Sequence, residues 1–167
     1  MSTSGDDQRG VPGPDPSDPS TTDQPAVCDN GRLDDIRPPL TAEAVATAHD
    51  AARLRHELSA WLALDVPDEH LDDLVLAAYE AIANAAEHAY SDRTDGAGPI
   101  HLRAHRYDDC VCVTVVDEGR WRVRTAQRFR SRGIALIRLL MSDVHIGPSR
   151  TGTTVHLRMW LPTVGLA

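Results

Sequence analysis

Residues 80–90 contain the densest group of side chains able to do chemistry. Glu80, Asn84 and His88 follow one another at intervals of four, among residues that are mostly alanine. In an α-helix each step of four advances by about 40°, so these side chains form one narrow stripe. The stripe borders the apolar face of the helix, where a carboxylate and a carboxamide could meet a ligand in a cleft. Spacing alone favours the simpler interpretation, a solvated helix face.

Three later segments have features that suit a nucleotide. Asp117 ends an apolar strand and Gly119 follows two residues on, which lets the backbone turn close to a ligand. Gly133 begins an apolar stretch of helical character, and the free N–H groups at a helix start bind anions such as phosphate. Gly152 and Thr153 open the last strand. Each feature is common alone, so the information lies in their combination and order.

In that order, segments 80–90, 117–119, 132–137 and 152–155 resemble the GHKL superfamily of ATPases, which includes gyrase, histidine kinases and heat-shock chaperones. The close match is to the bacterial branch of anti-sigma regulatory serine/threonine kinases, and it covers about residues 41–161. The resemblance implies an α+β fold of the Bergerat ATP-binding type. This is a two-layer α/β sandwich whose mixed, mostly antiparallel sheet is covered by helices on one face.

The resemblance also implies roles for the matching residues. Glu80 would act as general base toward the attacking hydroxyl, and Asn84 would hold Mg²⁺, a cation that prefers oxygen ligands. Asp117 would accept a hydrogen bond from the adenine amino group. The implied nucleotide-binding set, with ATP and Mg²⁺ as cofactors, is Asn84, His88, Asp117, Gly119, Arg132, Gly133 and Thr153.

The chain departs from the family pattern at two places. Ser131 stands where a glycine usually lies two positions before Gly133, and Arg120 follows Gly119 where a second glycine is frequent. Both changes bear on how closely the backbone approaches a nucleotide. The only basic cluster lies in the same region, and we interpret it as a solvated loop, with contact to phosphates or an acidic partner as the alternative. It consists of Arg120, Arg122, Arg124, Arg128, Arg130 and Arg132.

Composition narrows the function further. The net charge of −8 disfavours general nucleic-acid binding. All 17 basic residues are arginine, which excludes any mechanism that requires a lysine, including the Walker-type phosphate loop. No apolar run is long enough to span a membrane, and the acidic, polar start does not resemble a signal peptide, so we expect a cytoplasmic protein.

The chain divides into two parts. Residues 1–39 contain seven of the eleven prolines and lack periodicity, which predicts a disordered tail with at most a short strand near its end. Residues 40–167 form the predicted domain. We expect helices at 41–64, 68–89 and 133–141, and strands at 100–106, 110–116, 144–146 and 153–161. In the first helix the predicted apolar stripe is Val45, Ala48, Ala52, Leu58 and Leu62.

Cys110 and Cys112 lie two apart in an apolar run, so they should point to the same face of a strand. We interpret them as small core residues rather than as a redox or metal pair.

The sequence therefore predicts an ATP-binding anti-sigma factor with serine/threonine kinase activity toward a STAS-type anti-anti-sigma partner. It would sequester a sigma factor when that partner is unavailable, and it is expected to be a homodimer, through the helix at 41–64 or a sheet edge. The alternative is a non-catalytic sequestering module with the same fold and weak or structural ATP binding. Ser131 and Arg120 favour the alternative, whereas Glu80 favours the kinase.

Overall fold

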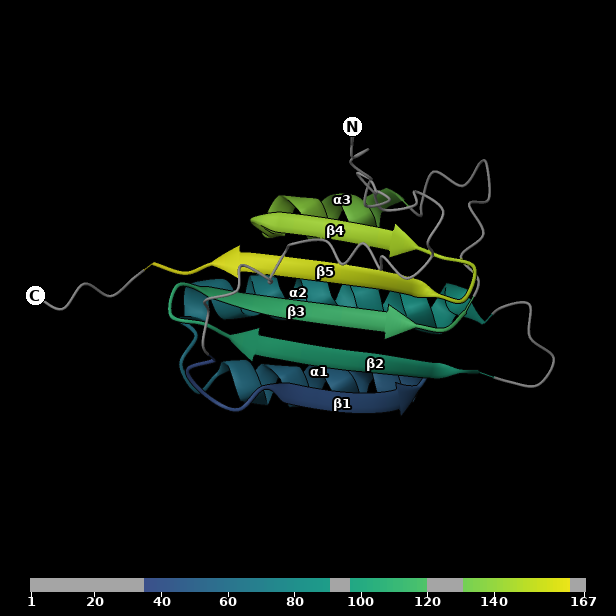
Figure 1. Cartoon of the computed structure of the whole chain (residues 1–167), viewed down its shortest axis with the longest axis horizontal. Coiled ribbons are helices and arrows are strands. Elements are labelled where there is room, and N and C mark those ends of the chain that lie inside the picture. The colour runs from purple at the N-terminus through teal and green to yellow at the C-terminus, as the bar shows by residue number, and fades with distance from the viewer. Residues whose placement is uncertain (1–34, 91–96, 120–130, 163–167) are drawn as a thin grey trace, which may run out of the picture.

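We describe residues 35–90, 97–119 and 131–162 of a computed structural model of the chain. Its centre is an open sheet with strand order β1-β2-β3-β5-β4 (Figure 1). Every neighbouring pair is antiparallel, so the sheet predicted to be mostly antiparallel is entirely so in the described part of the chain. The strands are β1 (Leu40–Val45), β2 (Pro99–Arg106), β3 (Cys110–Asp117), β4 (Asp143–Pro148) and β5 (Thr153–Trp160).

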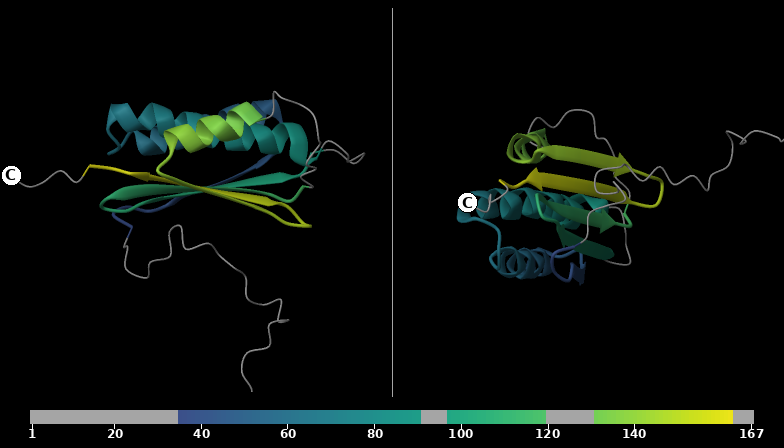
Figure 2. Two further views of the ribbon diagram at one scale, coloured as in Figure 1. Left: turned by 90° about the horizontal axis from the view of Figure 1, so that it is seen from above. Right: turned by 60° about the vertical axis from the view of Figure 1, so that its left-hand side comes forward.

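The helices all cover one face of this sheet, as the view along the layers shows (Figure 2). They are α1 (Ala48–Leu62), α2 (Asp68–Asn84) with its continuation η1 (Ala85–Ala89), and α3 (Ser131–Leu140). The predicted α+β, two-layer sandwich is therefore confirmed. No described helix combines the length and apolar character needed to cross a membrane.

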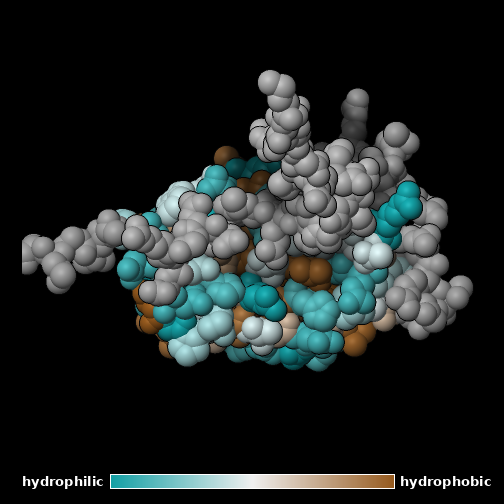
Figure 3. All heavy atoms as spheres, in the orientation of Figure 1, coloured by the Kyte–Doolittle hydropathy of each residue, from teal (hydrophilic) through white to brown (hydrophobic). Residues whose placement is uncertain are grey.

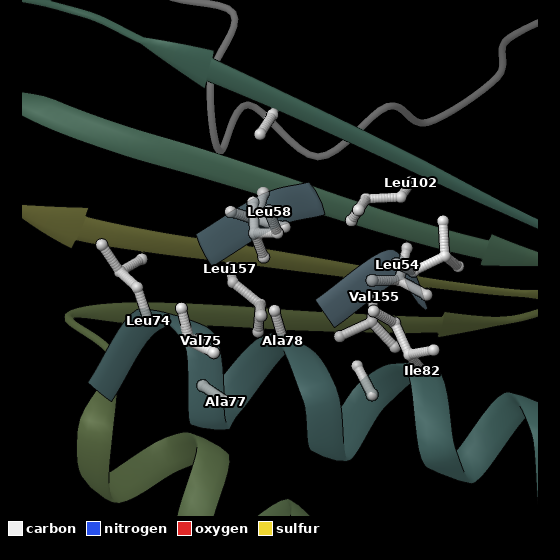
Figure 4. Packing of buried hydrophobic residues seen from close by; sticks show 14 of the residues in the cluster. Leu54, Leu58, Leu74, Val75, Ala77, Ala78, Ile82, Leu102, Val155 and Leu157 are labelled. Carbon is white, nitrogen blue, oxygen red and sulfur yellow. The ribbon is translucent and has the colours of Figure 1, made fainter. Parts of the chain in front are cut away.

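The core lies between the two layers (Figure 4). Side chains alternate between the faces of a strand, so every second residue of β2, β3 and β5 points toward the helices. Leu102, Val113 and Leu157 are fully buried there. They pack in one cluster with Leu58 of α1 and Leu74 of α2. Burial of each such side chain stabilises the fold by about 1.5–3 kcal/mol.

The first predicted helix begins too early. Residues 40–45 form β1, paired with β2 from Leu40–Ala104 to Val45–Pro99, and the helix starts only at Ala48. Thr47 caps it by accepting a hydrogen bond from the N–H of Asp50.

The predicted stripe of that helix is consequently wrong at three positions, because a strand has period two and a helix about 3.6. Val45 is exposed on the strand, and Ala48 and Ala52 are exposed on the helix. The buried face of α1 is instead Ala51, Leu54, Leu58 and Leu62.

The second predicted helix is close to the observed one. It starts at Asp68 as expected, and its apolar face is buried through Leu74, Ala78, Ala81 and Ile82, with Leu71 partly buried. The α-helix proper ends at Asn84, and a single π-helical turn, η1, continues it to Ala89. Such wider turns within helices are frequent at functional sites.

The opposite face of the sheet has a different character. Seen from that side, the described surface is mostly hydrophilic (Figure 3). Cys110 and Cys112 share this face and form a small buried cluster with Tyr107. Cys110 is a free thiol, as predicted for a small core residue, whereas Cys112 takes part in a disulfide, so that interpretation is wrong for Cys112. Burial raises the pKa of the Cys110 thiol to about 11, which keeps it protonated and unreactive at neutral pH.

Contacts with the domain begin before residue 40. Asp35 lies 3.0 Å from Nδ1 of His105, and Ile36 donates its N–H to the carbonyl of Arg106. Trp61 donates its indole N–H to the carbonyl of Pro38. Residues 1–34, which make up most of the predicted tail, lie outside the described part of the chain.

Candidate functional site

The first group of candidate residues lies where α2 meets the start of α3. A Cβ built at Gly133 would be 2.7 Å from Oε2 of Glu80 and 3.6 Å from Nδ2 of Asn84. Glu80 and Asn84 are both partly buried. The simpler interpretation of their stripe as a solvated helix face is therefore wrong for these two residues, because α3 covers it.

His88 lies in the π-helical turn, so it does not follow Glu80 and Asn84 at α-helical spacing. His88 lies within η1, is partly exposed, and has its Nε2 3.6 Å from Oε2 of Glu87. Its predicted position near phosphates stays a prediction.

A second group lies at the end of the β3–β5 ladder. Asp117 and Thr153 are register partners on the core face, and both are buried. Oδ1 of Asp117 accepts a hydrogen bond from the N–H of Gly119 at 3.0 Å. Thr153 contributes hydrogen bonds to the same carboxylate from its backbone and its side chain. The structure thus brings Asp117, Gly119 and Thr153 together, while their roles in nucleotide binding stay predictions.

Two glycines let the backbone close tightly around Asp117. Gly152 has φ +156°, and a Cβ there would lie 1.9 Å from the carbonyl oxygen of Asp117. A Cβ at Gly119 would lie 2.1 Å from the carbonyl oxygen of Ala89 at the end of η1. Any other residue at these positions would collide with backbone, so the two glycines set the shape of this end of the sheet.

Burial raises the pKa of the Asp117 carboxyl above its ordinary value of 3.8, and the hydrogen bonds from Gly119 and Thr153 oppose this rise. A buried carboxylate at a strand end is well suited to accept a hydrogen bond from a ligand, because few waters compete for it.

The described residues contain no group of three or more His, Cys, Asp or Glu side chains able to hold a metal ion. A structural site with an all-protein ligand set is therefore not built into this part of the chain. The donor set does fit Mg²⁺ bound with a nucleotide, since Mg²⁺ keeps several waters and takes one or two protein oxygens plus phosphate oxygens. The carboxamide oxygen of Asn84 is such a ligand.

The remaining basic candidates fall at the beginning of α3. Arg132 is exposed in its first turn, beside Gly133. Ser131, the departure from the family pattern, is the first residue of this helix. The other five arginines of the basic cluster and the departure at Arg120 lie outside the described residues.

Sequence reasoning assigned no role to Tyr90, the residue after η1. It is buried, its hydroxyl donates a hydrogen bond to the carbonyl of Pro99, and it accepts one from the N–H of Glu118. The sequence feature that could have identified Tyr90 is its place at the end of the helix that carries the candidate residues. A buried Tyr hydroxyl usually finds a polar partner.

Comparison with known proteins agrees with this fold. Residues 44–159 match the Histidine kinase-like ATPase domain family, and the chain belongs to that family. A similar solved structure is that of the RsbU and RsbW domains of Rv1364c from Mycobacterium tuberculosis, with 31% identity and a TM-score of 0.61. The match covers 76% of this chain and 34% of that one, so the present chain spans about a third of that protein. Within the GHKL superfamily, these findings support the anti-sigma regulator branch.

A second solved structure is the histidine kinase domain of the blue-light activated histidine kinase from Erythrobacter litoralis EL346. It is 23% identical with a TM-score of 0.49, and the match covers 65% of this chain and 58% of that one.

Proposed function

We propose that this chain is an anti-sigma factor that binds Mg²⁺ and ATP and phosphorylates a serine or threonine of a STAS-type anti-anti-sigma partner. The observation that carries the proposal is the meeting of Glu80 and Asn84 with Gly133 at the start of α3. This brings a carboxylate, a carboxamide and a helix N-terminus together, which are the groups that a phosphoryl transfer needs.

Two parts of the chain would hold the two ends of the nucleotide. Asp117 would accept a hydrogen bond from the adenine amino group, with Thr153 and Gly119 fixing the orientation of its carboxylate. The N–H groups at the start of α3, near Gly133, would face the phosphates, because the helix dipole and the unpaired N–H groups favour an anion there. Mg²⁺, held by Asn84, would supply neutralisation of phosphate charge when bound.

Glu80 would take the proton of the attacking hydroxyl, directly or through one water. The carboxylate is partly buried and lies against Gly133, which keeps it beside the helix end that would face the phosphates. Phosphoryl transfer depends mainly on positioning and charge neutralisation, so the absence of lysine from the sequence is compatible with this chemistry.

The partners in this proposal are a sigma factor and the STAS-type protein, in a cytoplasmic setting. Similarity to a structure that contains an RsbW domain supports a regulatory role of this kind. We expect a homodimer, with the outer edge of β1 and the exposed face of α1 as candidate surfaces. The exposed Val45 on that edge supports this choice.

The alternative is a sequestering module of the same fold that binds ATP weakly or structurally. Ser131 favours it, because a serine replaces the usual glycine at the first residue of α3, which would approach the phosphates. In this case the chain would still bind the sigma factor but would transfer no phosphoryl group.

The deciding experiment is calorimetric titration with ATP, with and without Mg²⁺, of the wild type and Asn84→Ala. Asp72→Ala, on the exposed side of the same helix, is the matched control. Binding that requires Mg²⁺ and is lost only in Asn84→Ala supports the nucleotide site. No binding at millimolar ATP would reject the kinase and favour the sequestering module.

A further inference from the structure

Tyr90 occupies an unusual position at the end of the β2–β3 ladder. The last pair of this ladder is Ile100 with Asp117, so the next pair in register would be Pro99 with Glu118. Instead of a direct bond between those two residues, the Tyr90 hydroxyl lies between them. It donates to the Pro99 carbonyl at 2.5 Å and accepts from the Glu118 N–H at 2.8 Å.

This insertion holds the two strands apart just beyond Asp117. A direct ladder bond would bring the Glu118 N–H to the Pro99 carbonyl and continue the strand in a straight line. With the hydroxyl between them, both backbone groups stay satisfied while the chain turns away from β2. It then reaches the end of η1, where Gly119 lies against Ala89.

The ring of Tyr90 is held as firmly as its hydroxyl. A Cβ at Gly98 would lie 2.1 Å from a ring carbon, so the ring packs directly against the backbone before β2. The N–H of Ala46 donates to the carbonyl of Gly98, which fixes that backbone in turn. The π-helical turn ends immediately before Tyr90 and delivers the side chain to this place.

We propose that Tyr90 is a positioning residue for the adenine side of the site, because its hydroxyl sets where Asp117 and Gly119 lie. This inference rests on the proposed function. Tyr90 acts through the segment 117–119, whose Gly119 N–H orients the carboxylate of Asp117. It would therefore affect recognition of the base more than the chemistry at Glu80.

The first test needs no nucleotide. Amide hydrogen exchange of the wild type should show the Glu118 N–H protected, although it lies beyond the last ladder pair. Tyr90→Phe removes the hydroxyl and should speed exchange at Glu118 and Gly119 by about tenfold, the effect of losing one hydrogen bond worth about 1.4 kcal/mol.

The control is Tyr79→Phe, a tyrosine of α2. Its hydroxyl has no hydrogen bond to the described residues, and its ring lies under Arg55 at 5.5 Å. It should leave exchange at Glu118 unchanged. A Glu118 amide that is unprotected in the wild type, or unaffected in Tyr90→Phe, would overturn the proposal.

The second test measures base selectivity. ITP lacks the exocyclic amino group of ATP. The dissociation constant of ITP divided by that of ATP therefore reports on the hydrogen bond to Asp117. We expect Tyr90→Phe to reduce this ratio by about tenfold, again the size of one hydrogen bond. The rate of transfer at saturating ATP should be retained. A general loosening of the fold would weaken the binding of ATP and ITP alike. If Tyr90→Phe speeds amide exchange but leaves the ratio of dissociation constants unchanged, Tyr90 has no role in recognition of the base.

Failure of the proposed function gives a different result. If the wild type binds neither nucleotide, the role in adenine recognition is rejected together with the kinase. Exchange at Glu118 still decides whether the hydroxyl positions the segment 117–119.

Discussion

The backbone of Gly133 lies directly against the carboxylate of Glu80: a Cβ at residue 133 would be only 2.7 Å from Oε2. The nearest atom is the far end of a flexible side chain and not a backbone atom. Glu80 can therefore move aside at little cost when a methyl group is added. Stability and activity should respond to this change in opposite ways.

Gly133→Ala is the variant that separates them. Alanine in place of glycine within a helix stabilises it by about 0.5–1 kcal/mol, so the melting temperature should stay the same or rise. The displaced Glu80 carboxylate should lower the rate of phosphoryl transfer to a STAS-type substrate. Thermal melts and single-turnover transfer assays check this, and full activity in Gly133→Ala would show that the position of Glu80 is unimportant.

Glu80→Gln tests the general base itself. The variant keeps the shape of the side chain but cannot accept the proton, so transfer should fall by about 10²–10⁴-fold. The dissociation constant for ATP, measured by calorimetry, should remain within a small factor of the wild-type value. If transfer survives at the wild-type rate, Glu80 is not the base.

Asp117 should make ATP binding depend on pH. Its carboxyl pKa is raised by burial above 3.8, so protonation in the folded protein begins at a higher pH than for an exposed Asp. The protonated form cannot accept the hydrogen bond in the same way, and affinity for ATP should weaken as the pH falls from neutral toward 3.8. Asp117→Asn should bind more weakly at neutral pH and without this pH dependence.

The same raised pKa affects folding with a definite sign. The pKa of Asp117 is higher in the folded than in the unfolded protein. Its contribution to the free energy of unfolding is therefore complete below the unfolded pKa and is lost as pH rises through the folded pKa. Relative to wild type, Asp117→Asn should therefore be more favourable at neutral pH than in acid. Urea unfolding at both ends of this range measures the difference. If the free energies of unfolding of wild type and Asp117→Asn change equally with pH, the raised pKa is not that of Asp117.

Gly119→Ala should disturb the junction between β3 and η1. The added Cβ would meet the Ala89 carbonyl at 2.1 Å, and backbone cannot rotate away as a side chain can. We expect a loss of about 1–3 kcal/mol in the free energy of unfolding, together with weaker ATP binding. Gly147→Ala in β4 is the matched control, since its Cβ would come no closer than 3.5 Å to another residue. Equal effects of the two substitutions would argue against a tight junction.

Much of the second helix could be predicted from the sequence. Its start at Asp68, its apolar face and the common face of Glu80 and Asn84 all depend on helical periodicity, which is a local property. The same is true of β2 and β3, whose alternation identifies their inner faces. The motifs in their order also indicated the superfamily, and the matching family confirms it.

Other features could not be predicted, because they depend on contacts between distant segments. Leu40 to Val45 has helix-forming residues but forms a strand, since pairing with β2 outweighs a weak local preference. The π-helical turn at 85–89 and the insertion of Tyr90 between Pro99 and Glu118 require the ends of α2, β2 and β3 to meet. The sequence by itself determined which residues are candidates for the chemistry. Only tertiary packing decided that Gly133 would touch Glu80 and that Tyr90 would hold the end of the sheet open, because such contacts join segments far apart in the chain.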